Sequence, residues 1–173
     1  MFNIRRFLLI VIITFSFNSL SEADDIKDFE IDGMSIGDSL LKYYDKKKII
    51  NALNDAYYYP DKKFLDIFIK PSNISSYEWL QITLKKSEKK FLAHAIAGQV
   101  DFTNNINECY KKKSDIAKEV QQFFDNRIKP KTVKIIHPID KSGKSKIETT
   151  EFQLNGGRIE IQCFDWSSNV SYS

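Results

Sequence analysis

The first 23 residues most strongly constrain what this chain can fold into, because they predict export. Two arginines precede an apolar run, Phe7–Phe17, that contains no charged residue. Small residues follow at Ser21 and Ala23, at the −3 and −1 spacing that signal peptidase requires. We therefore expect residues 1–23 to be a signal peptide and residues 24–173 to form the exported protein.

The alternative is that the same segment stays in place as a membrane anchor. The 11 residues Phe7–Phe17 would form a helix only about 17 Å long, whereas the hydrocarbon core of a bilayer is about 30 Å thick. Such a helix is too short to span the hydrocarbon core of a bilayer. We therefore expect contact with a membrane only through an uncleaved signal segment, and a periplasmic or secreted location for the protein.

Export also decides how the two cysteines of the mature chain, Cys109 and Cys163, are interpreted. In an oxidising compartment an even number of cysteines favours a disulfide. Cys109 lies on the apolar stripe of a long predicted helix that ends near Arg127, and Cys163 shares the apolar face of a predicted strand with Ile159 and Ile161. A helix packed on a sheet would bring these faces together. We predict a Cys109–Cys163 bond, and the alternative is two buried thiols.

Hydrophobic periodicity predicts a single α+β domain over residues 24–173. Two short helices are expected near the N-terminus, the first capped by Ser35 and the second capped by Asp45 and running from Lys46 to about Leu53. Alternating apolar residues indicate strands over residues 64–69, 77–84, 91–102, 133–136, 147–154 and 158–166, with the long helix between the third and the fourth. Short turns between the strands imply a mostly antiparallel sheet with the helices packed on one face.

Composition argues against several classes of partner. The formal net charge is only +3, and the mature part holds two arginines, Arg127 and Arg158. Because proteins that read nucleic acids typically use arginine to contact phosphates and bases, we expect no nucleic-acid partner. The two histidines, His94 and His137, are far apart, and no cysteine–histidine spacing suits zinc. We expect neither a metal nor a cofactor.

Two overlapping motifs near the N-terminus are typical of hydrolases. Residues 33–37 have the G-x-S-x-G form of a nucleophile elbow, and residues 37–40 spell Gly-Asp-Ser-Leu, the block for which GDSL hydrolases are named. An elbow follows a buried strand, whereas residues 28–32 carry three acidic side chains. The D-x-x-H pair that GDSL enzymes place near the C-terminus is also missing. A helix-capping role explains Ser35 without chemistry, so a small secreted hydrolase that uses Ser35 or Ser39 is only the alternative function.

Five aromatic residues could form an exposed patch that binds a partner: Tyr57, Tyr58, Tyr59, Tyr77 and Trp79. The three consecutive tyrosines precede a proline and are expected in a loop. Trp79 is expected to point away from the apolar side of its strand, which is formed by Leu80, Ile82 and Leu84. Packing in the core, or under a loop, is the alternative for all five.

The segment F-E-I-D-G-M-S-I-G-D-S-L-L-K-Y-Y, residues 29–44, resembles the opening of a family of small, uncharacterised exported bacterial proteins. Residues 109–112, 140–145 and 156–166 also resemble that family. The resemblance implies export and carries no activity. Members of the family continue past the Asp-Trp-Ser segment with a further strand and a helix, which predicts that residues 24–173 are a C-terminally truncated form.

These observations favour a non-enzymatic exported module that binds or scaffolds a protein or another component of the cell envelope. The expectation rests on the predicted signal, on the predicted disulfide, and on the lack of a convincing set of catalytic side chains in the sequence.

Overall fold

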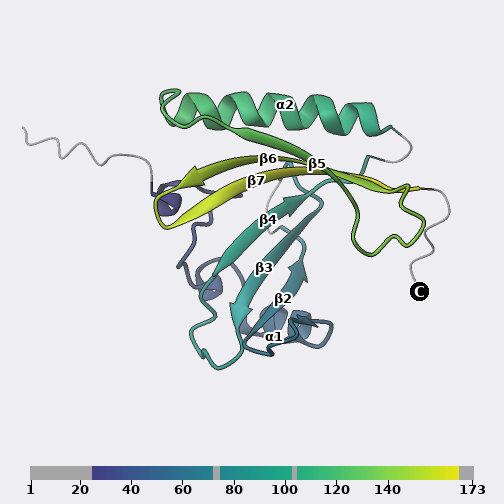
Figure 1. Cartoon of the computed structure of the whole chain (residues 1–173). Coiled ribbons are helices and arrows are strands. Elements are labelled where there is room, and N and C mark those ends of the chain that lie inside the picture. Colours follow the sequence, from purple (N-terminus) through teal and green to yellow (C-terminus); the bar gives the residue numbers. More distant parts are fainter. Residues whose placement is uncertain (1–24, 72–74, 103–104, 168–173) are drawn as a thin grey trace, which may run out of the picture.

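A computed structural model describes residues 25–71, 75–102 and 105–167. The predicted signal peptide and the end of the chain, where the family resemblance predicted truncation, lie outside the described residues. Within them the chain forms two antiparallel sheets and two α-helices, together with short 3-10 helices (Figure 1). The predicted α+β class and its antiparallel pairing are confirmed.

The first sheet has the strand order β1-β2-β3-β4. Its strands are β1 (Tyr57–Tyr58), β2 (Phe64–Ile69), β3 (Trp79–Lys85) and β4 (Ala95–Gln99). Helix α1 (Lys46–Leu53) lies beside this sheet (Figure 1), and its buried Ile49 belongs to the same core as the apolar residues of β2 and β3. The buried core on this face consists of Met34, Leu40, Tyr44, Ile49, Leu65, Ile67, Ile69, Leu80, Ile82, Leu84 and Ala93.

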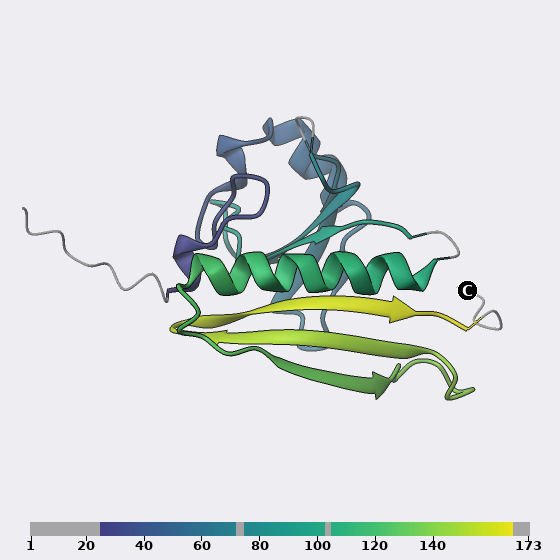
Figure 2. The same cartoon turned by 90° about the horizontal axis from the view of Figure 1, so that it is seen from above.

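The second sheet has the strand order β5-β6-β7, with β5 (Lys131–Ile136), β6 (Lys146–Leu154) and β7 (Gly157–Asp165). Helix α2 (Ile106–Phe123) packs against β7, as the view from above shows (Figure 2). A second core lies between them and consists of Ile26, Val120, Phe124, Phe152, Leu154 and Ile159. The predicted Asn-Gly turn joins β6 to β7, with Gly156 at a φ of +75° that favours glycine.

The division of the strands between two sheets differs from the one sheet that the alternation suggested. In the sequence, helix α2 lies between β4 and β5. The strands before it and the strands after it pack on separate cores. Alternation shows which side of a strand is buried, and it carries no information about which strands become neighbours.

The predicted first helix is also different in the structure. Ser35 does not cap a helix there; instead Ser39 caps the three-residue 3-10 helix η2 (Leu40–Lys42), its Oγ accepting from the Leu41 amide at 3.3 Å. The backbone N–H of Gly37 donates to the carbonyl of Ala93, so the segment is tied to the chain before β4 and cannot continue as a helix. The capping of α1 by Asp45 is confirmed, with 2.7 Å from Oδ1 to the Lys48 amide.

The predicted disulfide is confirmed. Cys109, in the first part of α2, is bonded to Cys163 of β7, and their Cα atoms are 6.0 Å apart. Cys163 is fully buried, so the bond lies in the layer between helix and sheet. It covalently fixes α2 to the strand that it covers, and it is compatible with an oxidising compartment.

A charged residue interrupts the apolar stripe of α2 at Lys113, and the structure buries this side chain. Its Nζ donates to Glu148 Oε1 at 2.7 Å and to Thr150 Oγ1 at 3.3 Å, both on β6. Only 6% of the Lys113 side chain is exposed, against 24% for Glu148. The apparent gap in the stripe is therefore a polar contact between helix and sheet.

Gly98 of β4 leaves room for an aromatic ring. Tyr77 packs over it, and a Cβ at position 98 would lie 2.3 Å from the ring. We expect Gly98→Ala to lower the free energy of unfolding by about 1–3 kcal/mol, because the ring must move out of a packed position. Urea denaturation followed by tryptophan fluorescence measures the change. Adding Tyr77→Ala to Gly98→Ala should cancel the steric part; an equal loss in the Tyr77→Ala background would contradict the contact.

Candidate functional site

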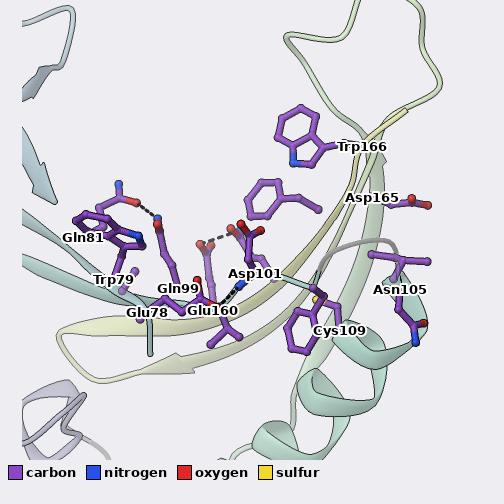
Figure 3. A pocket seen from close by; sticks show the side chains of 17 residues that line it. Glu78, Trp79, Gln81, Gln99, Asp101, Asn105, Cys109, Glu160, Asp165 and Trp166 are labelled. Atoms are coloured by element: carbon purple, nitrogen blue, oxygen red, sulfur yellow. Dashed lines mark hydrogen bonds between the residues drawn. The ribbon is translucent and has the colours of Figure 1, made fainter. Parts of the chain in front are cut away.

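The two sheets enclose a cleft of about 800 Å³ between them (Figure 3). One wall is the face of β3 and β4 that points away from α1, and the other is β7 together with the start of α2. The cleft is thus made where elements from both halves of the chain meet.

The wall formed by the first sheet carries a chain of hydrogen-bonded polar side chains. Gln99 Nε2 donates to Gln81 Oε1 at 2.8 Å, and Gln81 Nε2 donates to Asp66 Oδ2 at 2.7 Å. The buried Asp66 carboxylate also accepts from Thr83 Oγ1 at 2.6 Å and from Tyr59 OH at 2.8 Å. Burial and the Asp66 carboxylate raise the pKa of Tyr59. Because every link is satisfied, the two glutamines are held in fixed positions on the wall.

Sequence reasoning missed this wall. A signal for it exists in β2, where Asp66 is a lone carboxylate among apolar residues. A charged residue at such a position either breaks a strand or finds several hydrogen-bond partners on the opposite face. The partners here are Tyr59, directly after β1, and two residues of β3, and their identity depends on strand register.

Four carboxylates line the cleft, those of Glu78, Asp101, Glu160 and Asp165. Lysine, arginine and histidine do not occur among the described residues that line it. Glu160 forms an ion pair with Arg158 just outside, at 2.7 Å. The carboxylates of Asp101 and Asp165 accept no hydrogen bond from another described residue. Asp101 lies among the other lining side chains, whereas the Asp165 side chain points away from them (Figure 3). The cleft is therefore a region of negative potential, with the Asp101 carboxylate available to a ligand.

Aromatic rings stand on both walls. Trp79 of β3 is 41% exposed, and Phe164 of β7 is 43% exposed. Phe164 and Trp166 are stacked with ring centroids 6.0 Å apart, and His137 packs against Trp166 at 4.3 Å. Lys70 Nζ lies 5.1 Å from the Trp79 ring centroid, so this ring already accepts a cation on one side.

The structure does not gather the five predicted aromatic residues into one patch. Tyr57 and Tyr59 meet edge to face at 5.6 Å beside β2, whereas Trp79 lies in the cleft. Tyr58 points to the other face, where Lys86 lies over its ring, and Tyr77 packs on Gly98 at the first core. The predicted loop at residues 57–58 is the short strand β1, because Tyr57 and Tyr58 pair with β2.

The described residues of the two hydrolase motifs do not form a catalytic triad. Ser39 Oγ donates to the carbonyl of Lys90 at 2.7 Å, and the Ser35 amide donates to Asp38. Asp38 also accepts from Lys42 and from Tyr43 OH, which together hold its pKa at about 2. Among the described residues, no histidine makes a hydrogen bond to either serine.

The described residues were also searched for metal sites and for membrane-spanning helices. They contain no cluster of three or more His, Cys, Asp or Glu side chains placed to hold a metal ion. None of the described helices is both long and apolar enough to cross a membrane.

Comparison with known protein-family models, curated proteins and solved structures found no match to this chain.

Proposed function

We propose that this protein is an exported, non-enzymatic binding module that holds a cationic peptide segment of a partner protein in the cleft between its two sheets. The observation that carries the proposal is the lining of the cleft: four carboxylates, aromatic rings on both walls, and no basic side chain among its described residues.

The charge of the cleft favours a cation. Carboxylates that share a partly enclosed cleft repel one another, and a bound ammonium or guanidinium group relieves that repulsion. Trp79 and Phe164 offer ring faces to the same cation or to its aliphatic stem. Asp101 is the side chain that we expect to pair with it, and Asp165 adds to the negative potential at the edge of the cleft.

The amide groups favour a peptide over a simple polyamine. Gln81 and Gln99 are held on one wall, and Gln162 of β7 lines the other. Carboxamides both donate and accept, so they match the N–H and C=O groups of a peptide backbone. The predicted signal and the Cys109–Cys163 bond support an exported location.

Isothermal titration with the peptide acetyl-Lys-Phe-Lys-Phe-Lys-amide tests this proposal. We expect binding to weaken at least tenfold in the Asp101→Asn/Asp165→Asn variant, about 1.4 kcal/mol, and to weaken with added salt. The matched control is Asp28→Asn/Asp55→Asn, which removes the same charge from exposed positions outside the cleft. Undiminished binding in the first variant would refute the proposal, as would equal affinity for spermidine, which has ammonium groups but no peptide groups.

A further inference from the structure

We infer a second interface: strand β5 accepts an extended acidic segment of a partner protein, which adds to the second sheet as a further strand. This interface is separate from the cleft and does not depend on its function.

Strand β5 is an open edge. It pairs with β6 on one side, and in the strand order β5-β6-β7 nothing among the described residues pairs with its other side. All of its residues are exposed, including Val133, Ile135 and Ile136, the last at 59%. In the view from above it is the strand of its sheet farthest from α2 (Figure 2). Its outer N–H and C=O groups are therefore available to another strand.

The other sheet edges differ from β5. Strand β1 has only two residues, β7 is packed against α2, and β4 forms part of the cleft wall. Natural proteins protect long edges with charged side chains, with a proline or with a bulge. Strand β5 contains two lysines but no proline, and it has no bulge, because its register with β6 is continuous from Lys131↔Glu151 to Ile136↔Lys146. An exposed, partly apolar edge of this length that carries lysines is suited to the addition of an acidic strand.

The charge around β5 selects an acidic occupant. Residues 127–146 contain seven basic side chains and one acidic side chain, a net charge of +6, although the whole chain carries only +3. Two of the lysines, Lys131 and Lys134, belong to β5 itself. Lys134 lies 3.4 Å from Glu148, so only part of this charge is neutralised within the sheet. A second copy of the chain would bring an equally basic edge to β5, which disfavours self-pairing.

The register defines what the added strand should contain. Val133 and Ile135 lie on the face of the sheet that points away from α2. There Ile135 continues a row formed by Ile147 and Phe164. Apolar residues opposite Val133 and Ile135 would extend that row, and acidic residues opposite Lys131 and Lys134 would pair with them. Insertion of the same edge into a lipid surface would leave its backbone groups without partners, so a peptide strand satisfies β5 better.

Fluorescence anisotropy with the labelled peptide acetyl-Thr-Ile-Val-Glu-Val-Thr-Glu-Thr-amide tests the inference. We expect binding to weaken at least tenfold in Lys131→Glu/Lys134→Glu, and to return when both peptide glutamates are replaced by lysine. Lys131→Gln/Lys134→Gln serves if charge reversal disturbs folding, and should weaken binding in the same direction. Lys47→Glu/Lys89→Glu makes the same charge change at exposed lysines elsewhere and should leave binding unchanged.

Hydrogen exchange gives an independent readout, because strand addition should slow exchange of β5 amides that β6 leaves unpaired. Three outcomes would overturn the inference. The first is binding that ignores the charge reversal. The second is a dimer in light scattering that Ile135→Lys abolishes, which would identify a second copy as the occupant. The third is lysine-dependent binding to phosphatidylglycerol vesicles in place of the peptide.

Discussion

Replacing both cysteines, Cys109→Ala/Cys163→Ala, should lower the free energy of unfolding by about 4 kcal/mol. The bond closes a loop with a sequence separation of 54 residues, and the chain-entropy estimate for a loop of that size is about 4 kcal/mol. Since domains of this kind are stable by only about 5–15 kcal/mol, much of the total stability would be lost. Urea denaturation followed by the fluorescence of Trp79 and Trp166 measures the change.

Reduction supplies the control for this prediction. A strong reductant should destabilise the native protein by a similar amount and leave the double-alanine variant unaffected. The two cysteines must be replaced together, because a single replacement leaves a free thiol beside the fully buried position 163. Coincident denaturation curves for the native protein and the double variant would show that the bond contributes nothing to folding.

The second large effect is expected at Lys113. Lys113→Ala should cost about 3 kcal/mol, because removing one partner of a buried ion pair leaves the other without compensation. The value lies at the low end of the range for buried pairs because Glu148 is 24% exposed and also receives Lys134 at 3.4 Å. Alanine additionally removes the lysine stem from the contact between α2 and β6.

A double-mutant cycle separates the charge from the packing. Lys113→Met/Glu148→Gln keeps the volume of both side chains, and we expect its stability to lie within about 1 kcal/mol of the native value. Lys113→Met alone should be clearly less stable than this double variant. If the single and double variants are equally stable, then the pair is not coupled and the interpretation is wrong.

The pH dependence of stability gives a further check on the same pair. The hydrogen bond from Lys113 lowers the pKa of Glu148 below its ordinary value. A carboxyl group whose pKa is lower in the folded state stabilises the fold above its ordinary pKa. That contribution is lost as the pH falls through the lowered value. The loss of stability in acid should therefore be smaller in Lys113→Met/Glu148→Gln than in the native protein.

Local patterns in the sequence determined the elements of this protein. Alternation located β2 at its observed bounds and put Leu80, Ile82 and Leu84 on the buried face of β3, because a strand exposes every second side chain to each face. The helical stripe placed Cys109 opposite the strand face of Cys163, and so predicted the bond between them. Asp45 was recognised as a cap because capping depends on residues only a few positions apart.

Only the tertiary structure decided how those elements were combined. It divided the strands between two sheets, paired Lys113 with Glu148, and surrounded Asp66 with partners from β3 and with Tyr59. Trp79 and Phe164 both line the cleft although they are far apart in the sequence, and no local pattern predicts that they come together. Periodicity reports which face of each element is buried, whereas the neighbour across that face follows from packing the whole chain.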